Sequence, residues 1–148
     1  IINNNSLVVA GYLSVRSEVN LNLFLNFLLK NKFSLCLPYI NKLKSPLIFK
    51  KFIMNTKLVR GKYNIMHPNN EILLIPNIIL IPLVGFDESK NRIGYGGGYY
   101  DRTIECLEKK NDVLKLGVAF DEQETIRIPN GKYDKKLDVI ITPTRLIT

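Results

Sequence analysis

The chain has 148 residues, of which 46% are hydrophobic and 23% charged, a balance that is typical of a globular protein and excludes a disordered one. The length is enough to bury a sizeable core, so we expect a single domain over residues 1–148. The formal net charge of +8 favours anionic partners such as nucleotides, polyanionic cofactors or nucleic acid.

The first part of the chain predicts a strand, a helix and a second strand. Ser6–Val9 is a short apolar run typical of a buried strand. The Leu- and Phe-rich stretch Val19–Leu29 predicts a largely buried helix, with Ser17 or Asn20 as its N-cap. Phe33–Leu37 predicts the next strand, which we expect the following proline to stop.

The stretch 39–71 shows little periodicity. It is rich in lysine and contains the turn-forming segment "HPNNE". We therefore predict no regular element here. His67, the only histidine, lies in this polar turn, and we interpret it as a surface residue.

The remainder of the chain alternates strands with a helix. Ile78–Ile81 is a continuous β-branched and leucine run, as expected for a strand covered on both faces. A loop over 83–100 leads into a helix from Asp101 to about Lys110, and Lys115–Phe120 and Leu137–Thr142 predict two more strands. This alternation predicts an α/β fold with a mostly parallel sheet flanked by helices. In such folds ligands bind at the carboxyl ends of the strands.

Charge and cysteine usage add little about function. The lysines are dispersed, and no block reaches five consecutive basic residues, so we interpret them as a solvated surface. Cys36 and Cys106 form no CxxC pair and are too few for a disulfide framework. We expect buried free thiols and a reducing, cytoplasmic compartment. No run is long enough to cross a bilayer, and we expect no membrane partner.

The segment "NRIGYGGGYYDR", residues 91–102, is the strongest candidate for a binding site. Glycines allow backbone N–H groups to approach an anion, and the helix that follows adds free donors and a favourable dipole. Arg92 and Arg102 could donate to phosphate or carboxylate oxygens, and the tyrosines could stack on a flat ring. Asp101 could hold a divalent cation or simply cap the helix. The spacing matches neither a P-loop nor the dinucleotide fingerprint, and a tight turn remains the alternative.

Longer stretches resemble one enzyme family. "GFDESKNRIGYGGGYYDR" resembles the signature of the 5-formyltetrahydrofolate cyclo-ligases, also called methenyltetrahydrofolate synthetases. "GYLSVRSEVN", "FSLCLPYI" and "YDKKLDVIITP" resemble further family segments in the same order. Tyr133 stands where many members have histidine. Members normally begin with a helix that carries a Lys/Arg cluster for ATP phosphates, so we expect this chain to be truncated before Ile1.

The resemblance implies an activity and a set of site residues. The reaction is the ATP- and magnesium-dependent conversion of 5-formyltetrahydrofolate to 5,10-methenyltetrahydrofolate by a monomer. The metal ligands implied are Asp101 and Asp134. The ATP-binding residues implied are Arg92, Ile93, Gly94, Tyr95, Gly96, Gly97, Gly98, Tyr99 and Tyr100. The folate-binding residues implied are Leu13, Glu18, Tyr95, Gly96, Gly97, Gly98 and Tyr99.

Some of these residues have ordinary structural interpretations as well. Glu18 could lie in the first turn of a helix, and Asp134 could be a turn aspartate. We expect Asp87 to brace its own loop by an Asx-turn. Two alternative functions stay open: a non-catalytic remnant that retains a folate pocket and, behind it, a basic nucleic-acid-binding domain.

Overall fold

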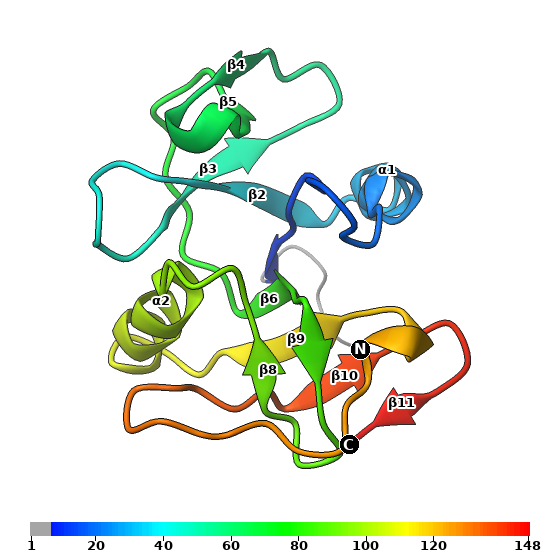
Figure 1. The fold of residues 1–148 in the computed structure, drawn as a ribbon. Helices are drawn as coiled ribbons and strands as arrows, with labels where there is room; N and C mark the ends of the chain where they lie inside the picture. Colours follow the sequence, from blue (N-terminus) through cyan, green and yellow to red (C-terminus); the bar gives the residue numbers. More distant parts are fainter. Residues whose placement is uncertain (1–6) are drawn as a thin grey trace.

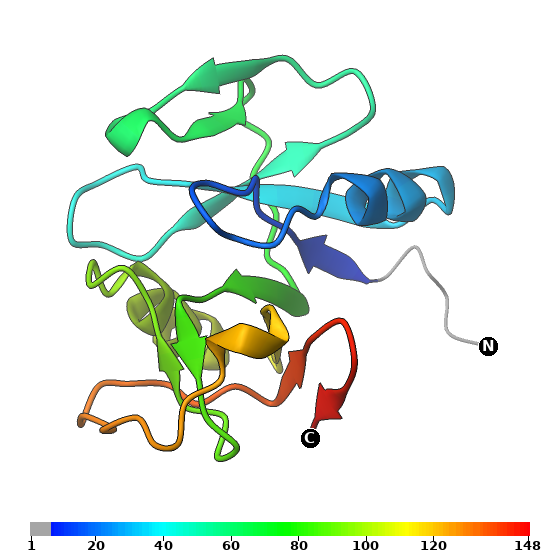
Figure 2. The same ribbon diagram turned by 45° about the vertical axis from the view of Figure 1, so that its right-hand side comes forward.

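The computed structural model describes residues 7–148, and its centre is a seven-stranded, mostly parallel sheet (Figures 1 and 2). The strand order is β11-β10-β9-β6-β1-β2-β3. The four inner pairings are parallel, and the two outer ones, β10 with β11 and β2 with β3, are antiparallel. The strands of this sheet are β1 (Val8–Ala10), β2 (Ser34–Tyr39), β3 (Ile48–Phe52), β6 (Ile78–Pro82), β9 (Leu114–Val118), β10 (Val139–Ile141) and β11 (Leu146–Ile147).

Two α-helices cover opposite faces of this sheet (Figure 1). They are α1 (Asn22–Lys30) and α2 (Tyr99–Glu108). Successive side chains of a strand point to opposite faces, so β6 supplies both cores. Ile79 and Ile81 join the core beneath α2, while Leu80 joins the core beneath α1. All three are buried, which confirms the prediction of a strand covered on both faces.

Smaller elements complete the chain. They are the hairpin of β4 (Leu58–Arg60) and β5 (Met66–Pro68), the pair of β7 (Gly85–Phe86) and β8 (Arg92–Ile93), and 3₁₀ turns at Lys62–Asn64 and Asp121–Gln123. The prediction of no regular element over 39–71 is therefore wrong, because β3, β4 and β5 lie there. β4 and β5 have three residues each, too few to show an alternation of apolar and polar residues, and two adjacent lysines interrupt the apolar residues of β3.

Several predicted boundaries also need correction. β2 runs through Pro38 to Tyr39, because β1 ends opposite Cys36 and leaves β2 bonded only to β3 at that point. Helix α1 begins three residues later than predicted, with Leu21 at the N-cap, although the Asn20 side chain accepts from the Asn22 amide at 2.8 Å. The predicted strand at Ser6–Val9 corresponds to β1, and its first residue lies outside the described residues.

Helix α2 begins at Tyr99, two residues before the predicted start. Gly98 occupies the N-cap with a left-handed φ of 67°, a conformation that glycine adopts at little cost. Asp101 therefore does not cap the helix but lies in its first turn.

The two cysteines are free, as predicted. Cys36 is buried, and this burial raises its thiol pKa to about 12, while Cys106 is half-buried.

Candidate functional site

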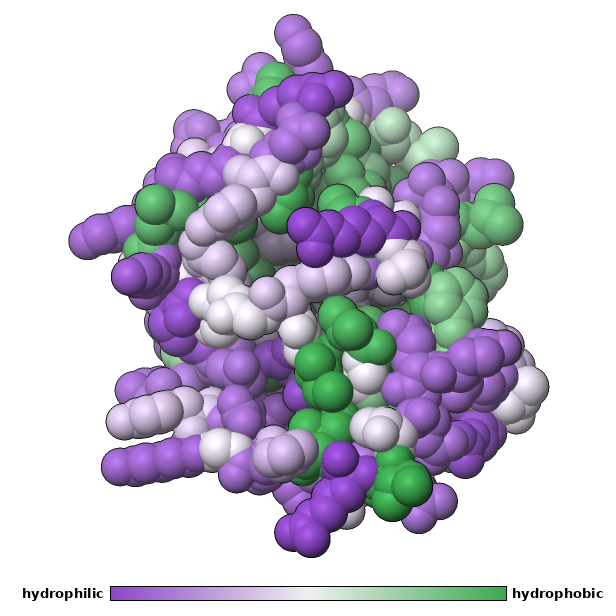
Figure 3. Space-filling model, viewed as in Figure 1, coloured by the Kyte–Doolittle hydropathy of each residue, from purple (hydrophilic) through white to green (hydrophobic). Residues whose placement is uncertain are grey.

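A cavity of about 390 Å³ opens at the carboxyl ends of β1, β2 and β6. It lies between residues 94–98 at the start of α2, called the glycine loop below, and a wall built from β2 and the segment 61–67. Figure 3 shows this face hollowed above the glycine loop, with hydrophilic residues around much of the opening. The predicted location of the ligand site at the strand ends agrees with this geometry.

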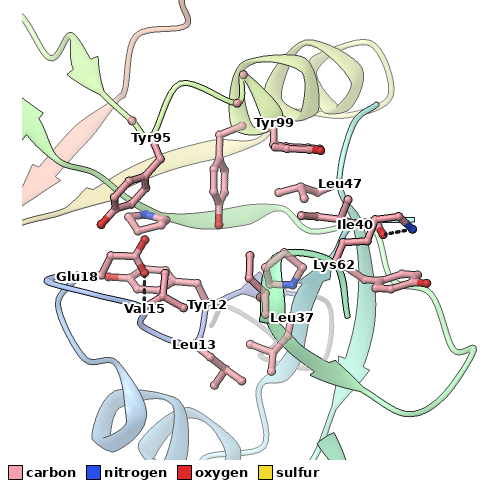
Figure 4. Close-up of a pocket in the computed structure, with 18 of the residues that line it drawn as sticks. Tyr12, Leu13, Val15, Glu18, Leu37, Ile40, Leu47, Lys62, Tyr95 and Tyr99 are labelled. Atoms are coloured by element: carbon pink, nitrogen blue, oxygen red, sulfur yellow. Dashed lines mark hydrogen bonds between the residues drawn. The ribbon is translucent and has the colours of Figure 1, made fainter. Parts of the chain in front are cut away.

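The cavity brings together residues that are far apart in the sequence. Leu13 and Glu18 follow β1 (Figure 4). The glycine loop follows β8, and Asp134 comes from the loop before β10. Every residue predicted for ATP, folate or metal lines this one cavity, except Ile93. Ile93 instead pairs with Gly85 in the β7–β8 hairpin.

The glycine loop presents bare backbone to the cavity. Gly96 and Gly98 both have positive φ, at 86° and 67°, which favours glycine at these two positions. A Cβ on Gly97 would lie only 2.9 Å from the Tyr99 ring, so a side chain there would displace a residue that lines the cavity. The loop can therefore approach an anion closely, and the N-terminus of α2 adds free N–H groups.

Arg92 reaches Asp101 across the base of the loop. Its Nη2 donates to Asp101 Oδ1 at 2.8 Å, and its side chain is 6% exposed. The Lys135 backbone N–H donates to the same oxygen at 3.0 Å. Within residues 7–148, both hydrogen bonds to the Asp101 carboxylate go to Oδ1, so Oδ2 is available for another ligand. The Lys135 bond also holds the loop that carries Asp134 against the start of α2.

Arg102 has a different position from the one the sequence suggested. Its Nη2 donates to the Gly97 carbonyl at 2.8 Å, and its guanidinium lies 4.9 Å from the Tyr99 ring centre. It does not line the cavity. Arg102 therefore braces the glycine loop from behind.

Asp134 is an exposed carboxylate at the rim. Its Oδ2 accepts from the Gly131 amide at 2.6 Å, so it is also a turn aspartate as the alternative interpretation proposed. Within residues 7–148 no cluster of three acidic, histidine or cysteine side chains could hold a metal. Asp101 and Asp134 are a pair of carboxylates on one cavity, which suits magnesium, since this ion keeps several waters and takes one or two carboxylates together with substrate phosphates.

Glu18 lies at the opposite side of the cavity from the Leu47 wall (Figure 4). Its Oε2 accepts from the Val15 amide at 2.9 Å, in a turn that precedes α1 and not in the helix itself. Burial raises the pKa of Glu18, and the Val15 hydrogen bond only partly offsets this. Burial, together with the charge of Glu18, also raises the pKa values of Tyr12 and Tyr100, so both phenols stay neutral.

Asp87 braces its loop as predicted. Its carboxylate accepts from the Asn91 backbone and side chain, each at 3.0 Å, and from the Ile128 amide at 2.9 Å. Burial alone would raise the pKa of Asp87, but these hydrogen bonds outweigh it and lower the pKa. The residue is buried and lies outside the cavity lining.

The sequence did not indicate the second wall of the cavity. The lining residues missed are Tyr12, Val15, Leu37, Pro38, Tyr39, Ile40, Leu47, Gly61, Lys62, Ile65, Met66, His67 and Pro82. The interpretation of His67 as a surface residue is wrong, since it is 9% exposed and its ring packs at a tilt of 40° against Tyr39 with ring centres 4.3 Å apart. A close approach of Gly61 to the His67 ring accompanies this burial. No local pattern in the sequence signalled this burial.

Thr103 joins the two walls. Its buried hydroxyl donates to the Tyr99 carbonyl in α2 and accepts from the Leu47 amide at 2.8 Å.

We expect Thr103→Val to lower the free energy of unfolding by about 1–3 kcal/mol, because the buried Leu47 N–H loses its acceptor. Urea unfolding measures this change. Thr125→Val is the matched control at an exposed site, and equal effects of the two substitutions would contradict the prediction.

Fold and site together define an α/β protein whose ligand cavity lies at the carboxyl ends of its parallel strands. The family model described as "5-formyltetrahydrofolate cyclo-ligase family" matches residues 2–143. The chain therefore belongs to the 5-formyltetrahydrofolate cyclo-ligase family of enzymes, as its motifs predicted.

Individual relatives agree with this assignment. The 5-formyltetrahydrofolate cyclo-ligase of Mycoplasma genitalium is 35% identical over 134 residues, which cover 90% of this chain and 70% of the relative. The 5-formyltetrahydrofolate cyclo-ligase of Haemophilus influenzae is 27% identical over 140 residues, which cover 90% of this chain and 74% of the relative. The solved 5,10-methenyltetrahydrofolate synthetase of Aquifex aeolicus superimposes with a TM-score of 0.79 at 30% identity, covering 97% of this chain and 72% of that one. The solved 5,10-methenyltetrahydrofolate synthetase of Mycoplasma pneumoniae superimposes with a TM-score of 0.65 at 26% identity, and the match covers 94% of this chain and 74% of that one.

Among the described residues, neither helix has the length and apolarity that a bilayer span requires.

Proposed function

We propose that this chain converts 5-formyltetrahydrofolate and ATP to 5,10-methenyltetrahydrofolate, ADP and phosphate, with magnesium. The observation that carries the proposal is the convergence of Glu18, the glycine loop, Asp101 and Asp134 on one cavity. A carboxylate for the pterin and bare backbone for phosphate are thus available within one volume of about 390 Å³.

The chemistry explains why ATP is required. An amide oxygen leaves poorly, so the formyl oxygen first attacks the γ-phosphorus and ADP departs. The N10 nitrogen then attacks the activated formyl carbon, loses its proton and closes the ring, and the oxygen leaves as phosphate. Phosphoryl transfer depends on positioning and charge neutralisation more than on covalent help from the protein.

The residues of the cavity suit these demands. Backbone N–H groups of the glycine loop and of the first turn of α2 would bind phosphate oxygens. The Glu18 carboxylate would accept hydrogen bonds from the ring N–H and amino group of the pterin. Leu13, Tyr95 and Tyr99 would pack against the flat rings of the folate.

Asp101 and Asp134 would hold magnesium, which neutralises charge on the phosphate oxygens when bound. Arg92 would orient Asp101 through the Nη2–Oδ1 hydrogen bond, and its remaining N–H groups on the cavity wall would be free to donate to phosphate oxygens.

The direct test follows the near-ultraviolet absorbance of the methenyl product with 5-formyltetrahydrofolate, ATP and magnesium. We expect absorbance to grow only when ATP and metal are both present. A folded sample that binds the folate without turnover would instead support the non-catalytic alternative, and a sample that binds no folate would overturn the proposal.

A further inference from the structure

A lysine stands at the end of the cavity away from Glu18. Lys62 lines the cavity beside Ile40 and Leu47, while Glu18 and Tyr95 lie at the other end (Figure 4). We propose that Lys62 binds a carboxylate of the glutamate portion of the folate, an inference that rests on the proposed function. It assigns a tail subsite to this chain and makes Lys62 a determinant of substrate specificity.

Lys62 is an exposed residue, and two backbone carbonyls orient its ammonium before any ligand arrives. Its Nζ donates to the Asn41 carbonyl at 2.9 Å and the Ile40 carbonyl at 3.4 Å. An ammonium has three N–H donors, so one remains for an anion. Binding through a group that is already ordered costs less conformational entropy than binding through a free lysine.

The turn that carries Lys62 has an unusual backbone. Tyr63 and Asn64 both have positive φ, at 55° and 60°, and Asn64 accepts from Arg60 at 2.6 Å. The Tyr63 ring meets the Tyr99 ring edge-on, with centres 6.2 Å apart. Left-handed conformations at residues other than glycine persist where the surroundings hold them, and they concentrate at functional sites. The turn therefore connects the Lys62 end of the cavity to the helix of the glycine loop.

The charge distribution favours an anion at this end. Residues 19–70 contain nine lysines and arginines and no aspartate or glutamate. The rest of the chain has the other twelve basic residues and all thirteen acidic ones. The formal charge of segment 19–70 is therefore +9 and that of the remainder −1, which together give the net +8. This segment forms α1 and the strands β2 to β5, and its residues in β2, in β5 and in the turn at Lys62 line the cavity. Lys62 is the one basic residue of the segment among the lining residues, and the positive excess around it attracts an anionic tail before contact.

The arrangement of the cavity matches the chemical order of the substrate. A reduced folate carries a polar pterin, an aromatic aminobenzoyl ring and a glutamate with two carboxylates. From Glu18 to Lys62, the cavity presents a carboxylate, then apolar side chains such as Leu37 and Leu47, then the ammonium. The glutamate is the part of the molecule that needs a cation. The glycine loop already provides donors for the phosphates of ATP.

The test compares two substrates and three variants. The substrates are 5-formyltetrahydrofolate and 5-formyltetrahydropteroate, which lacks the glutamate. Lys62→Met removes the charge but keeps the long apolar stem, Lys62→Arg retains a cation, and Lys57→Met is a matched control at an exposed lysine outside the cavity.

We expect Lys62→Met to raise the KM for the folate about tenfold, with kcat and the KM for ATP unchanged, since one charge-assisted hydrogen bond is lost. For the pteroate, Lys62→Met and the parent chain should have equal KM values. Lys62→Arg should keep most of the preference for the folate, and Lys57→Met should keep all of it.

Two results would overturn the inference: an equal loss for both substrates, or a rise in the KM for ATP alone, which would place Lys62 at the nucleotide. If the chain proves unable to turn over, the proposed function fails, but calorimetric binding still tests the subsite. The parent chain must then bind the folate more tightly than the pteroate, and Lys62→Met must remove that difference; equal binding by the parent chain refutes the inference.

Discussion

Asp101→Asn is expected to lower the turnover of 5-formyltetrahydrofolate at least about a hundredfold while the fold is retained. Asparagine can still accept the Arg92 and Lys135 hydrogen bonds at Oδ1, so the start of α2 should stay in place. What is lost is the negative charge and the oxygen available to magnesium. The expected defect is therefore specific to magnesium-dependent use of ATP.

The measurement is turnover as a function of magnesium, together with calorimetric binding of ATP with and without the metal. We expect metal-free ATP binding to be retained and its enhancement by magnesium to disappear. Asp112→Asn, at an exposed position outside the cavity, is the matched control. Unchanged magnesium dependence in Asp101→Asn would remove this residue from the metal site.

Glu18→Gln is expected to raise the KM for 5-formyltetrahydrofolate roughly tenfold to a hundredfold, because hydrogen bonds to a charged acceptor are the strong ones. The KM for ATP should not change. Glutamine can still accept from the Val15 amide, so the turn before α1 is preserved.

The same substitution has an opposite effect on stability, and its sign follows from the pKa. Burial raises the pKa of Glu18 in the folded state above its ordinary value of 4.5, so folding favours the neutral acid. This favourable contribution is complete below the ordinary value and is lost as the pH rises through the raised value. Glutamine is neutral at every pH, so the substituted chain should be the more stable one at neutral pH.

Thermal unfolding between pH 4 and pH 8 measures this difference, which should vanish at the acid end of the range. In the parent chain, folate affinity should fall as the pH is lowered through the same interval, since the pterin needs the ionised carboxylate. If Glu18→Gln instead has a lower Tm than the parent chain at neutral pH, the ionised Glu18 stabilises the fold. The explanation that its carboxylate lowers stability and is present for substrate binding would then be wrong.

Both substitutions combine a functional readout with a structural one, because the residues concerned have local structural roles as well. Asp101 accepts hydrogen bonds that hold the Asp134 loop, and Glu18 closes the turn before α1. A loss of activity alone would not separate the two roles. The magnesium dependence and the pH dependence of stability do separate them.

Much of the site could be predicted from the sequence because its residues lie in continuous motifs. The run from Arg92 to Asp101 has its glycines, tyrosines and charge within ten residues, and it follows the most apolar strand. Local constraints therefore place it at a strand end and a helix start. The family, the parallel sheet and the position of the cavity all followed from such local patterns.

Tertiary structure alone decided the rest. The wall of the cavity opposite the glycine loop joins β2, which its apolar run predicted, to segment 61–67, which has no apolar period, and the two meet only after long-range pairing. Nothing local indicated that His67 would be buried on Tyr39 or that Lys62 would lie in the same cavity as Glu18. The roles of Arg92 and Arg102 likewise depended on which acceptor each guanidinium reaches in three dimensions. The family and the glycine-loop side of the cavity could be predicted from the sequence, because those depend on neighbours along the chain. Only the folded chain determined the basic wall opposite, because that wall depends on contacts between distant residues.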